Sequence, residues 1–168
     1  QNEIHDIGCG EGHWVIQWNL EGMAARGSDF SEQAIELARR NAASEGVPPE
    51  VFSRRGICDL EPGLDSADLI VCLEVLEHLE RPEDGLEALR RVATDYVILS
   101  VPREPLWRLL NMARGKYLSR FGNTPGHLQH WSCKGFVELA SRYFDVIAIH
   151  RPLPWTMLLC RRKPAAPT

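Results

Sequence analysis

The chain has 168 residues, of which 44% are hydrophobic and 25% charged, a composition typical of one globular domain with an apolar core and not of a disordered chain. Nineteen Lys and Arg residues against 23 Asp and Glu give a net charge of -4, which argues against a nucleic-acid-binding protein. No apolar run approaches the roughly 20 residues that cross a bilayer. Five cysteines without a CxxC pair indicate reduced thiols, so we expect a cytoplasmic protein.

Short apolar runs alternate with helical stretches along the chain, and this alternation predicts βαβ units on one mostly parallel sheet. We expect strands at residues 2–7, 23–29, from 51, 68–73, 96–101, 144–150 and 156–161. Helices are expected between them, with Ser31 and Ser132 as N-caps and Pro82 in a first turn. The connection before the last strand is too short for a parallel crossover, which predicts an antiparallel last strand. Residues 163–168 are expected to fray.

A glycine-rich turn joins the first expected strand to the first helix. The turn reads Asp-Ile-Gly-Cys-Gly-Glu-Gly, with Gly8, Gly10 and Gly12 at alternate positions. Small residues at such a turn let a ligand lie directly against the backbone. The spacing differs from the GxGxxG of dinucleotide-binding folds, and the carboxylates of Asp6 and Glu11 favour a ligand with an ammonium group over a phosphate. A tight turn without a ligand is the alternative.

A further acidic residue, Asp29, ends the second expected strand, where a carboxylate can accept hydrogen bonds from the hydroxyls of a ribose. With the glycine turn and the run DLIVCLEVLEHL at residues 68–79, the chain resembles the class I S-adenosylmethionine-dependent methyltransferases over nearly its whole length. It is most similar to the type-11 and ubiquinone-biosynthesis-like group, which acts on small molecules. The resemblance implies a doubly wound, Rossmann-like α/β sheet of seven strands, the last antiparallel, with helices on both faces and S-adenosylmethionine as cofactor.

The resemblance also assigns cofactor-binding roles to individual residues. Asp29 would hold the ribose, and Asp6 would lie near the ammonium. Phe30 would pack on the adenine, with plain core packing as the alternative. Asp59, after the third strand, would accept a hydrogen bond from the exocyclic amine of adenine. The complete set comprises Asp6, Gly8, Cys9, Gly10, Gly12, Asp29, Phe30, Cys58, Asp59 and Leu73.

Two carboxylates and an imidazole follow the fourth expected strand. Glu74, Glu77 and His78 have the spacing that places three side chains on one face of a helix. Such a set suits Mg²⁺, Mn²⁺ or Fe²⁺, and the ExxEH pattern resembles ligands of metal-dependent ubiquinone-biosynthesis and small-RNA 2′-O-methyltransferases. The alternative is that the acidic side chains only favour a helix dipole.

Residues 103–131 break the βαβ rhythm, so we expect a lid or substrate insertion there. Apolar and basic side chains alternate as in an amphipathic helix. Such a helix could cover the substrate site, rest on anionic lipid headgroups or pack on its own domain. His127 and His130 follow in a turn-rich stretch and are the candidates for a catalytic general base. Two histidines that merely hold a loop are the alternative.

Two classes of function follow. The first is an enzyme that transfers a methyl group to an oxygen, nitrogen or carbon of a small or lipid-like acceptor, with peripheral membrane contact left open. The second is a non-catalytic module of the same fold that serves as a partner subunit. We expect residues 1–168 to form a single methyltransferase domain, preceded by N-terminal cap helices that the sequence lacks. The oligomeric state is left open.

Overall fold

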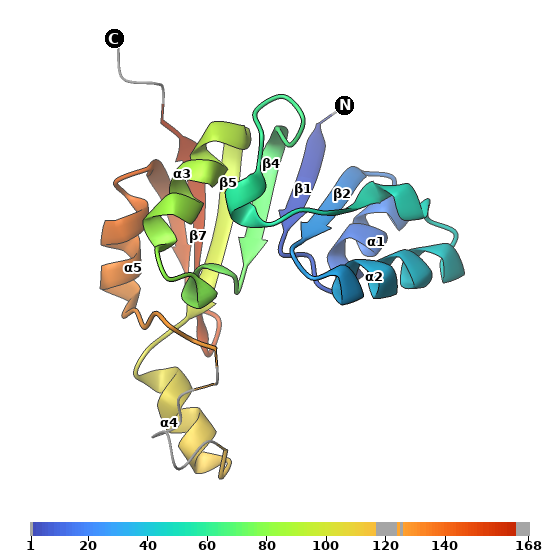
Figure 1. Ribbon diagram of the computed structural model, residues 1–168. Helices are drawn as coiled ribbons and strands as arrows, with labels where there is room; N and C mark the ends of the chain where they lie inside the picture. The colour runs from blue at the N-terminus through green and yellow to red at the C-terminus, as the bar shows by residue number, and fades with distance from the viewer. Residues whose placement is uncertain (1, 117–123, 125, 164–168) are drawn as a thin grey trace.

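The computed structural model describes residues 2–116, 124 and 126–163, and its centre is one seven-stranded sheet (Figure 1). The strand order across the sheet is β3-β2-β1-β4-β5-β7-β6. The strands are β1 (Glu3–Ile7), β2 (Ala24–Asp29), β3 (Phe52–Arg54), β4 (Ala67–Leu73), β5 (Ala93–Pro102), β6 (Phe144–His150) and β7 (Trp155–Arg162). All seven expected strands are present, so the predicted fold class is confirmed.

The last strand has the predicted direction. Strands β1 to β5 pair in parallel, whereas β7 is antiparallel to both β5 and β6, with Val97 opposite Cys160 in the register. Only residues 151–154 connect β6 to β7, and a parallel crossover needs a dozen residues or more. The short connection therefore dictates the antiparallel pairing.

Helices cover both faces of the sheet and enclose two apolar cores. The helices are α1 (His13–Leu20), α2 (Glu32–Ser44), α3 (Pro82–Val92), α4 (Leu106–Ala113) and α5 (Cys133–Ala140). One core contains buried side chains of α1 and α2, and the other contains those of α3 and α5. The expected N-caps are confirmed, because the hydroxyls of Ser31 and Ser132 accept hydrogen bonds from the N–H groups of Ala34 and Gly135.

The excursion at residues 103–131 leaves the sheet at the carboxyl end of β5 and carries α4 beyond that edge (Figure 1). Its two ends are joined, because the Glu104 N–H donates to the carbonyl of Trp131 and Arg103 bridges to the same residue. The sequence pattern placed Leu118, Arg120 and Phe121 in the same amphipathic segment, but they lie outside the described residues, as do residues 164–168. None of the helices in the described ranges is long and apolar enough to cross a membrane.

Candidate functional site

The glycine turn is fixed to the end of β2 by backbone hydrogen bonds. The N–H groups of Gly8 and Cys9 both donate to the carbonyl of Ser28, at 2.8 and 3.0 Å. The Asp29 carboxylate then accepts from the Gly10 N–H at 3.0 Å and from the Ser31 N–H at 2.9 Å. One carboxylate therefore aligns the turn with the start of α2.

The three glycines of the turn have positive φ angles, but their surroundings differ. A Cβ atom on Gly8 would lie 2.2 Å from Val75, and one on Gly12 would lie 2.5 Å from the Phe52 ring. A Cβ atom on Gly10 would meet nothing within 4 Å. The packing of the chain itself accounts for Gly8 and Gly12, whereas Gly10 faces open space into which a ligand can come against the backbone.

Gly12→Ala is expected to lower the free energy of unfolding by about 1 to 3 kcal/mol more than Gly22→Ala does. Gly22 shares the positive φ, at 81° against 82°, but its Cβ position is open. The backbone strain is therefore matched, and only Gly12→Ala adds a clash with Phe52. Urea unfolding of both variants measures the difference. Equal losses would show that the ring adjusts without cost.

The carboxyl ends of the strands surround a cavity of about 660 Å³ beside the glycine turn. Five of the expected cofactor residues line it, namely Gly8, Asp29, Phe30, Cys58 and Asp59. Phe30 is 78% exposed, so its alternative interpretation as a core residue is wrong. The remaining expected residues, Asp6, Cys9, Gly10, Gly12 and Leu73, lie outside the lining.

Asp6 lies buried beneath the turn. Burial and the neighbouring charge of Asp29 raise the pKa of its carboxyl from 3.8 to about 7. An unpaired negative charge in this position is costly, and a ligand that brings an ammonium or sulfonium cation close to it would offset the cost.

Asp6→Asn is expected to flatten the pH dependence of stability between about pH 4 and 7. Because the carboxyl has a higher pKa in the folded than in the unfolded state, the folded state binds more protons in this window and its stability falls as pH rises. An amide of the same shape has no such charge, so the variant should gain about 2 to 4 kcal/mol relative to the wild type at pH 8 and little at pH 4. Urea unfolding at both pH values measures this. Parallel pH profiles for the two proteins would contradict the expectation.

Glu74, Glu77 and His78 do not share one helix face, so this part of the prediction is wrong. A three-residue 3₁₀ turn, Leu76–His78, follows β4, and Glu74 precedes it with φ +58°. The Glu74 carboxylate accepts hydrogen bonds from the Ser100 hydroxyl and from the indole N–H of Trp155, both at 2.8 Å. Each Glu74 oxygen thus accepts one hydrogen bond from a residue distant in the chain.

The Glu77 carboxyl is the unsatisfied group of this region. Its side chain is 1% exposed, and neither of its oxygens has a hydrogen-bond partner. Burial and the nearby charge of Glu74 raise its pKa to about 8. Ligand atoms of Glu77, His78 and His127 all lie within 4.8 Å of one another. Among the described residues, the group close enough to share a metal ion therefore differs from the expected one, with His127 in the place of Glu74.

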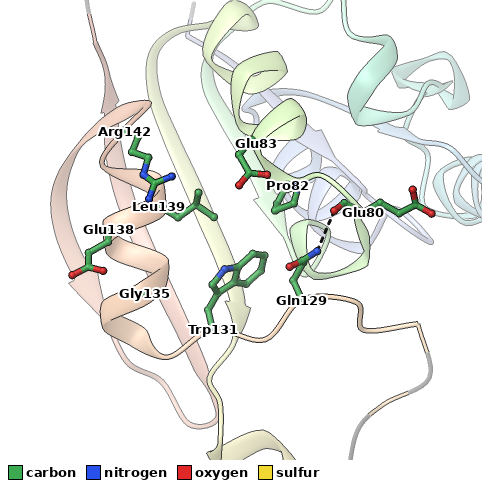
Figure 2. A pocket seen from close by; sticks show the side chains of 9 residues that line it. All are labelled: Glu80, Pro82, Glu83, Gln129, Trp131, Gly135, Glu138, Leu139 and Arg142. Carbon is green, nitrogen blue, oxygen red and sulfur yellow. Dashed lines mark hydrogen bonds between the residues drawn. The ribbon is translucent and has the colours of Figure 1, made fainter.

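The chain segment 126–129 holds His127 over the end of β4. The N–H groups of Leu128 and Gln129 donate to the carbonyl of Glu77 at 2.8 and 3.0 Å. The Gln129 amide donates to the carbonyl of Leu79 and to that of Glu80, the second of which Figure 2 shows. His127 itself packs against the rings of His78 and Trp107. Nothing in the local sequence indicates the contact between His127 and His78, which are 49 positions apart.

Both imidazoles can ligate a metal in their neutral form. Nδ1 of His78 lies 2.9 Å from the carbonyl of Gly126, so in the neutral ring this nitrogen carries the proton and Nε2 has the free lone pair. Burial and the charges of His78 and His130 lower the pKa of His127 to about 4, which keeps that ring neutral at pH 7. His130 is exposed and interacts with the charge of Glu104.

A second cavity, of about 350 Å³, lies between α3 and α5 (Figure 2). It contains Trp131, Arg142 and several carboxylates, but none of the residues expected to bind a cofactor or a metal. It is therefore separate from the site at the glycine turn.

Comparison with known proteins identifies the family. A family model described as a methyltransferase domain matches residues 5–97. The ubiquinone biosynthesis O-methyltransferase of Methylococcus capsulatus is 26% identical over 152 residues, which are 80% of this chain and 62% of the relative. The protein of the same name from Cupriavidus pinatubonensis is 33% identical over 88 residues, 51% of this chain and 34% of that one. The chain thus spans less than two thirds of these curated relatives.

Solved structures share the fold. The magnesium protoporphyrin IX methyltransferase of Synechocystis PCC 6803, solved with bound SAH, has a TM-score of 0.74 at 22% identity and aligns with 96% of this chain and 74% of its own. An S-adenosylmethionine-dependent methyltransferase from Methanosarcina mazei has the same TM-score at 21% identity, over 96% and 92% of the two chains. Since the matched family model covers more than half of the 168 residues, this chain belongs to the methyltransferase domain family.

Proposed function

We propose that this protein is an S-adenosylmethionine-dependent methyltransferase that acts on a small acceptor. The observation that carries the proposal is the open approach to the Gly10 backbone beside the Asp29 carboxylate, at the edge of the 660 Å³ cavity. A cofactor pressed against a backbone and held by a carboxylate needs this combination. The named relatives and solved neighbours, which include methyltransferases solved with SAH and SAM, support the same cofactor.

Each part of the cofactor has a matching group in or next to the cavity. Asp29 accepts hydrogen bonds from the ribose hydroxyls, and Asp6 attracts the cationic methionine end. Phe30 offers an exposed ring to the adenine, and Asp59 accepts from its exocyclic amine. S-adenosylmethionine supplies a reactive methyl group on its sulfonium, so the protein contributes mainly proximity and alignment.

We also propose that Glu77, His78 and His127 hold a divalent cation and that the acceptor presents a hydroxyl to it. The unsatisfied Glu77 oxygens and the lone pair left on His78 fit such an ion. A cation there would lower the pKa of the acceptor hydroxyl. The relatives, named as O-methyltransferases, support oxygen as the methylated atom. In this arrangement His127 is a metal ligand, which removes it from the role of general base.

The acceptor would reach the site beside the excursion at residues 103–131. Trp107 on α4 stacks on His127 and lies 6.2 Å, centroid to centroid, from the ring of Trp155. Leu109 on the same helix is 54% exposed, and Arg108 lies next to it. Aromatic rings next to an apolar and basic helix suit a ring-containing or lipid-like acceptor.

Calorimetric titration of the protein with S-adenosylhomocysteine tests the proposal. We expect saturable binding to one site per chain. A non-catalytic module that keeps the fold but has lost the cavity would show no binding, and that result would overturn the proposed function.

A further inference from the structure

We infer that Arg55 and Asp65 are positioning residues, which set the turn Ile57–Asp59 against Asp29 and thereby give the cavity its preference for adenine. The inference rests on the proposed function, because it assigns the adenine end of the same cavity to this turn. Neither residue is marked by the sequence pattern that identifies the glycine turn and Asp29.

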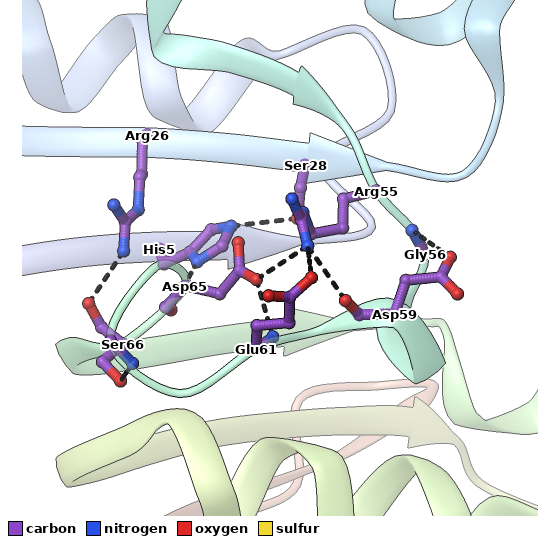
Figure 3. A network of polar contacts seen from close by, with 10 residues as sticks. His5, Arg26, Ser28, Arg55, Gly56, Asp59, Glu61, Asp65 and Ser66 are labelled. Carbon is purple, nitrogen blue, oxygen red and sulfur yellow. Dashed lines mark hydrogen bonds and ion pairs between the residues drawn. The ribbon is translucent and has the colours of Figure 1, made fainter.

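Arg55 ties together both sides of the loop that lines the cavity. It follows β3, and its N–H donates to the carbonyl of Asp29 at 2.9 Å. Its guanidinium donates to the carbonyl of Asp59 at 3.0 Å and contacts the carboxylates of Glu61 and Asp65 at 3.1 and 3.4 Å (Figure 3). All three oxygens surround one nitrogen, Nη1, so a single cationic group connects the Asp59 carbonyl with the two carboxylates.

Asp65 anchors this loop to the interior of the sheet. Its side chain is 6% exposed, and its carboxylate also accepts from the Glu61 N–H at 2.8 Å. Nδ1 of His5 lies 3.0 Å from the Asp65 carbonyl, and Nε2 of the same ring lies 2.9 Å from the Ser28 hydroxyl. Both nitrogens of the buried His5 ring thus have partners, and this residue links the loop to β1 and β2.

The loop held in this way contributes one wall of the cavity. The lining includes Gly8 and Asp29 and, from this loop, Arg55, Gly56, Ile57, Cys58 and Asp59. The Asp59 carboxylate is fixed within the turn by the N–H of Gly56 at 3.3 Å.

Without the Arg55 guanidinium, the Asp59 carbonyl loses its donor and the buried Asp65 carboxylate loses its cation. The backbone bond from the Arg55 N–H to the Asp29 carbonyl would remain, but the turn that carries Asp59 would lose its side-chain tie to Arg55 and, through Asp65, to the interior of the sheet.

The test compares two ligands that differ only in the six-membered ring of the purine. S-adenosylhomocysteine carries an amine at C6 and an acceptor at N1. S-inosylhomocysteine carries an N–H at N1 and a carbonyl oxygen at C6, which a fixed Asp59 carboxylate repels. We expect the wild type to prefer the adenosyl compound by at least about tenfold in a calorimetric titration. Arg55→Gln and Asp65→Asn should each weaken binding of the adenosyl compound and bring the preference close to one. Arg55→Lys should fall between them and the wild type.

Arg90→Gln is the matched control, because Arg90 forms a 2.6 Å ion pair with Glu87 on α3, outside the cavity lining. It should leave both affinities unchanged. If Arg55→Gln and Asp65→Asn keep the wild-type preference for the adenosyl compound, the inference is overturned but the proposed function is not, even if both affinities fall. The same holds if the wild type binds both ligands equally. A wild type that binds neither ligand would overturn the proposed function itself. If Arg55→Gln does not fold, Arg55→Lys and Asp65→Asn decide the question.

Discussion

Gly10→Val and Asp29→Ala are each expected to weaken binding of S-adenosylhomocysteine by about 1 to 3 kcal/mol, roughly 5- to 150-fold. Gly10→Val places a branched side chain in space that the chain leaves open, where the backbone must meet the ligand. Asp29→Ala removes the acceptor for the ribose and also leaves the N–H groups of Gly10 and Ser31 without their carboxylate partner. Calorimetric titration of the two variants beside the wild type measures both losses.

Matched substitutions separate the loss of a ligand contact from strain. Gly46 has φ +76° and an open Cβ position, as Gly10 does, but it follows α2 and is outside the cavity lining. Gly46→Val should therefore cost stability and leave the affinity unchanged. Asp95→Ala removes an exposed carboxylate outside the cavity lining and should also bind normally. Unchanged affinity in both Gly10→Val and Asp29→Ala would contradict the assignment of the cofactor site.

The features that could be predicted from the sequence depend on short-range patterns. The glycine turn, Asp29 and the continuous apolar run of β4 lie within a few residues of the elements they define, so the strand positions, the caps and the antiparallel β7 follow from the residue pattern and from loop length. The cavity brings Gly8, Asp29 and Asp59 together because the carboxyl ends of adjacent parallel strands share one edge.

The missed features depend on long-range contacts. The spacing of Glu74, Glu77 and His78 predicts one helix face, but only a three-residue 3₁₀ turn forms there. Glu74 precedes this turn with φ +58° and bonds to Ser100 and Trp155, which are distant in the chain. His127 comes close to Glu77 and His78 through a chain segment that returns to Glu77 after an excursion of more than 20 residues. Hydrophobic periodicity carries no information about such a return. Arg55 was missed because a guanidinium that binds its own loop has no spacing signature.

His127→Ala and Glu77→Gln are each expected to weaken binding of Mn²⁺ by more than about 100-fold, because each removes a ligand of the proposed cation. Titration with Mn²⁺, followed by the electron paramagnetic resonance signal of the free ion, measures the affinity without any need for the acceptor. Glu74→Gln should have a smaller effect, since Glu74 is not a member of the cluster of ligand atoms.

The control for this experiment is the second histidine of the same segment. His130 is exposed and is not a member of the cluster of ligand atoms, so His130→Ala should bind Mn²⁺ as the wild type does. Equal losses in His127→Ala and His130→Ala would contradict the assigned ligand set, and a wild type that does not bind Mn²⁺ would contradict the metal site. In either case titration with S-adenosylhomocysteine still tests the cofactor cavity independently, because Asp29 and the glycine turn hold their geometry through Ser28 and Ser31 and not through Glu77 or His127.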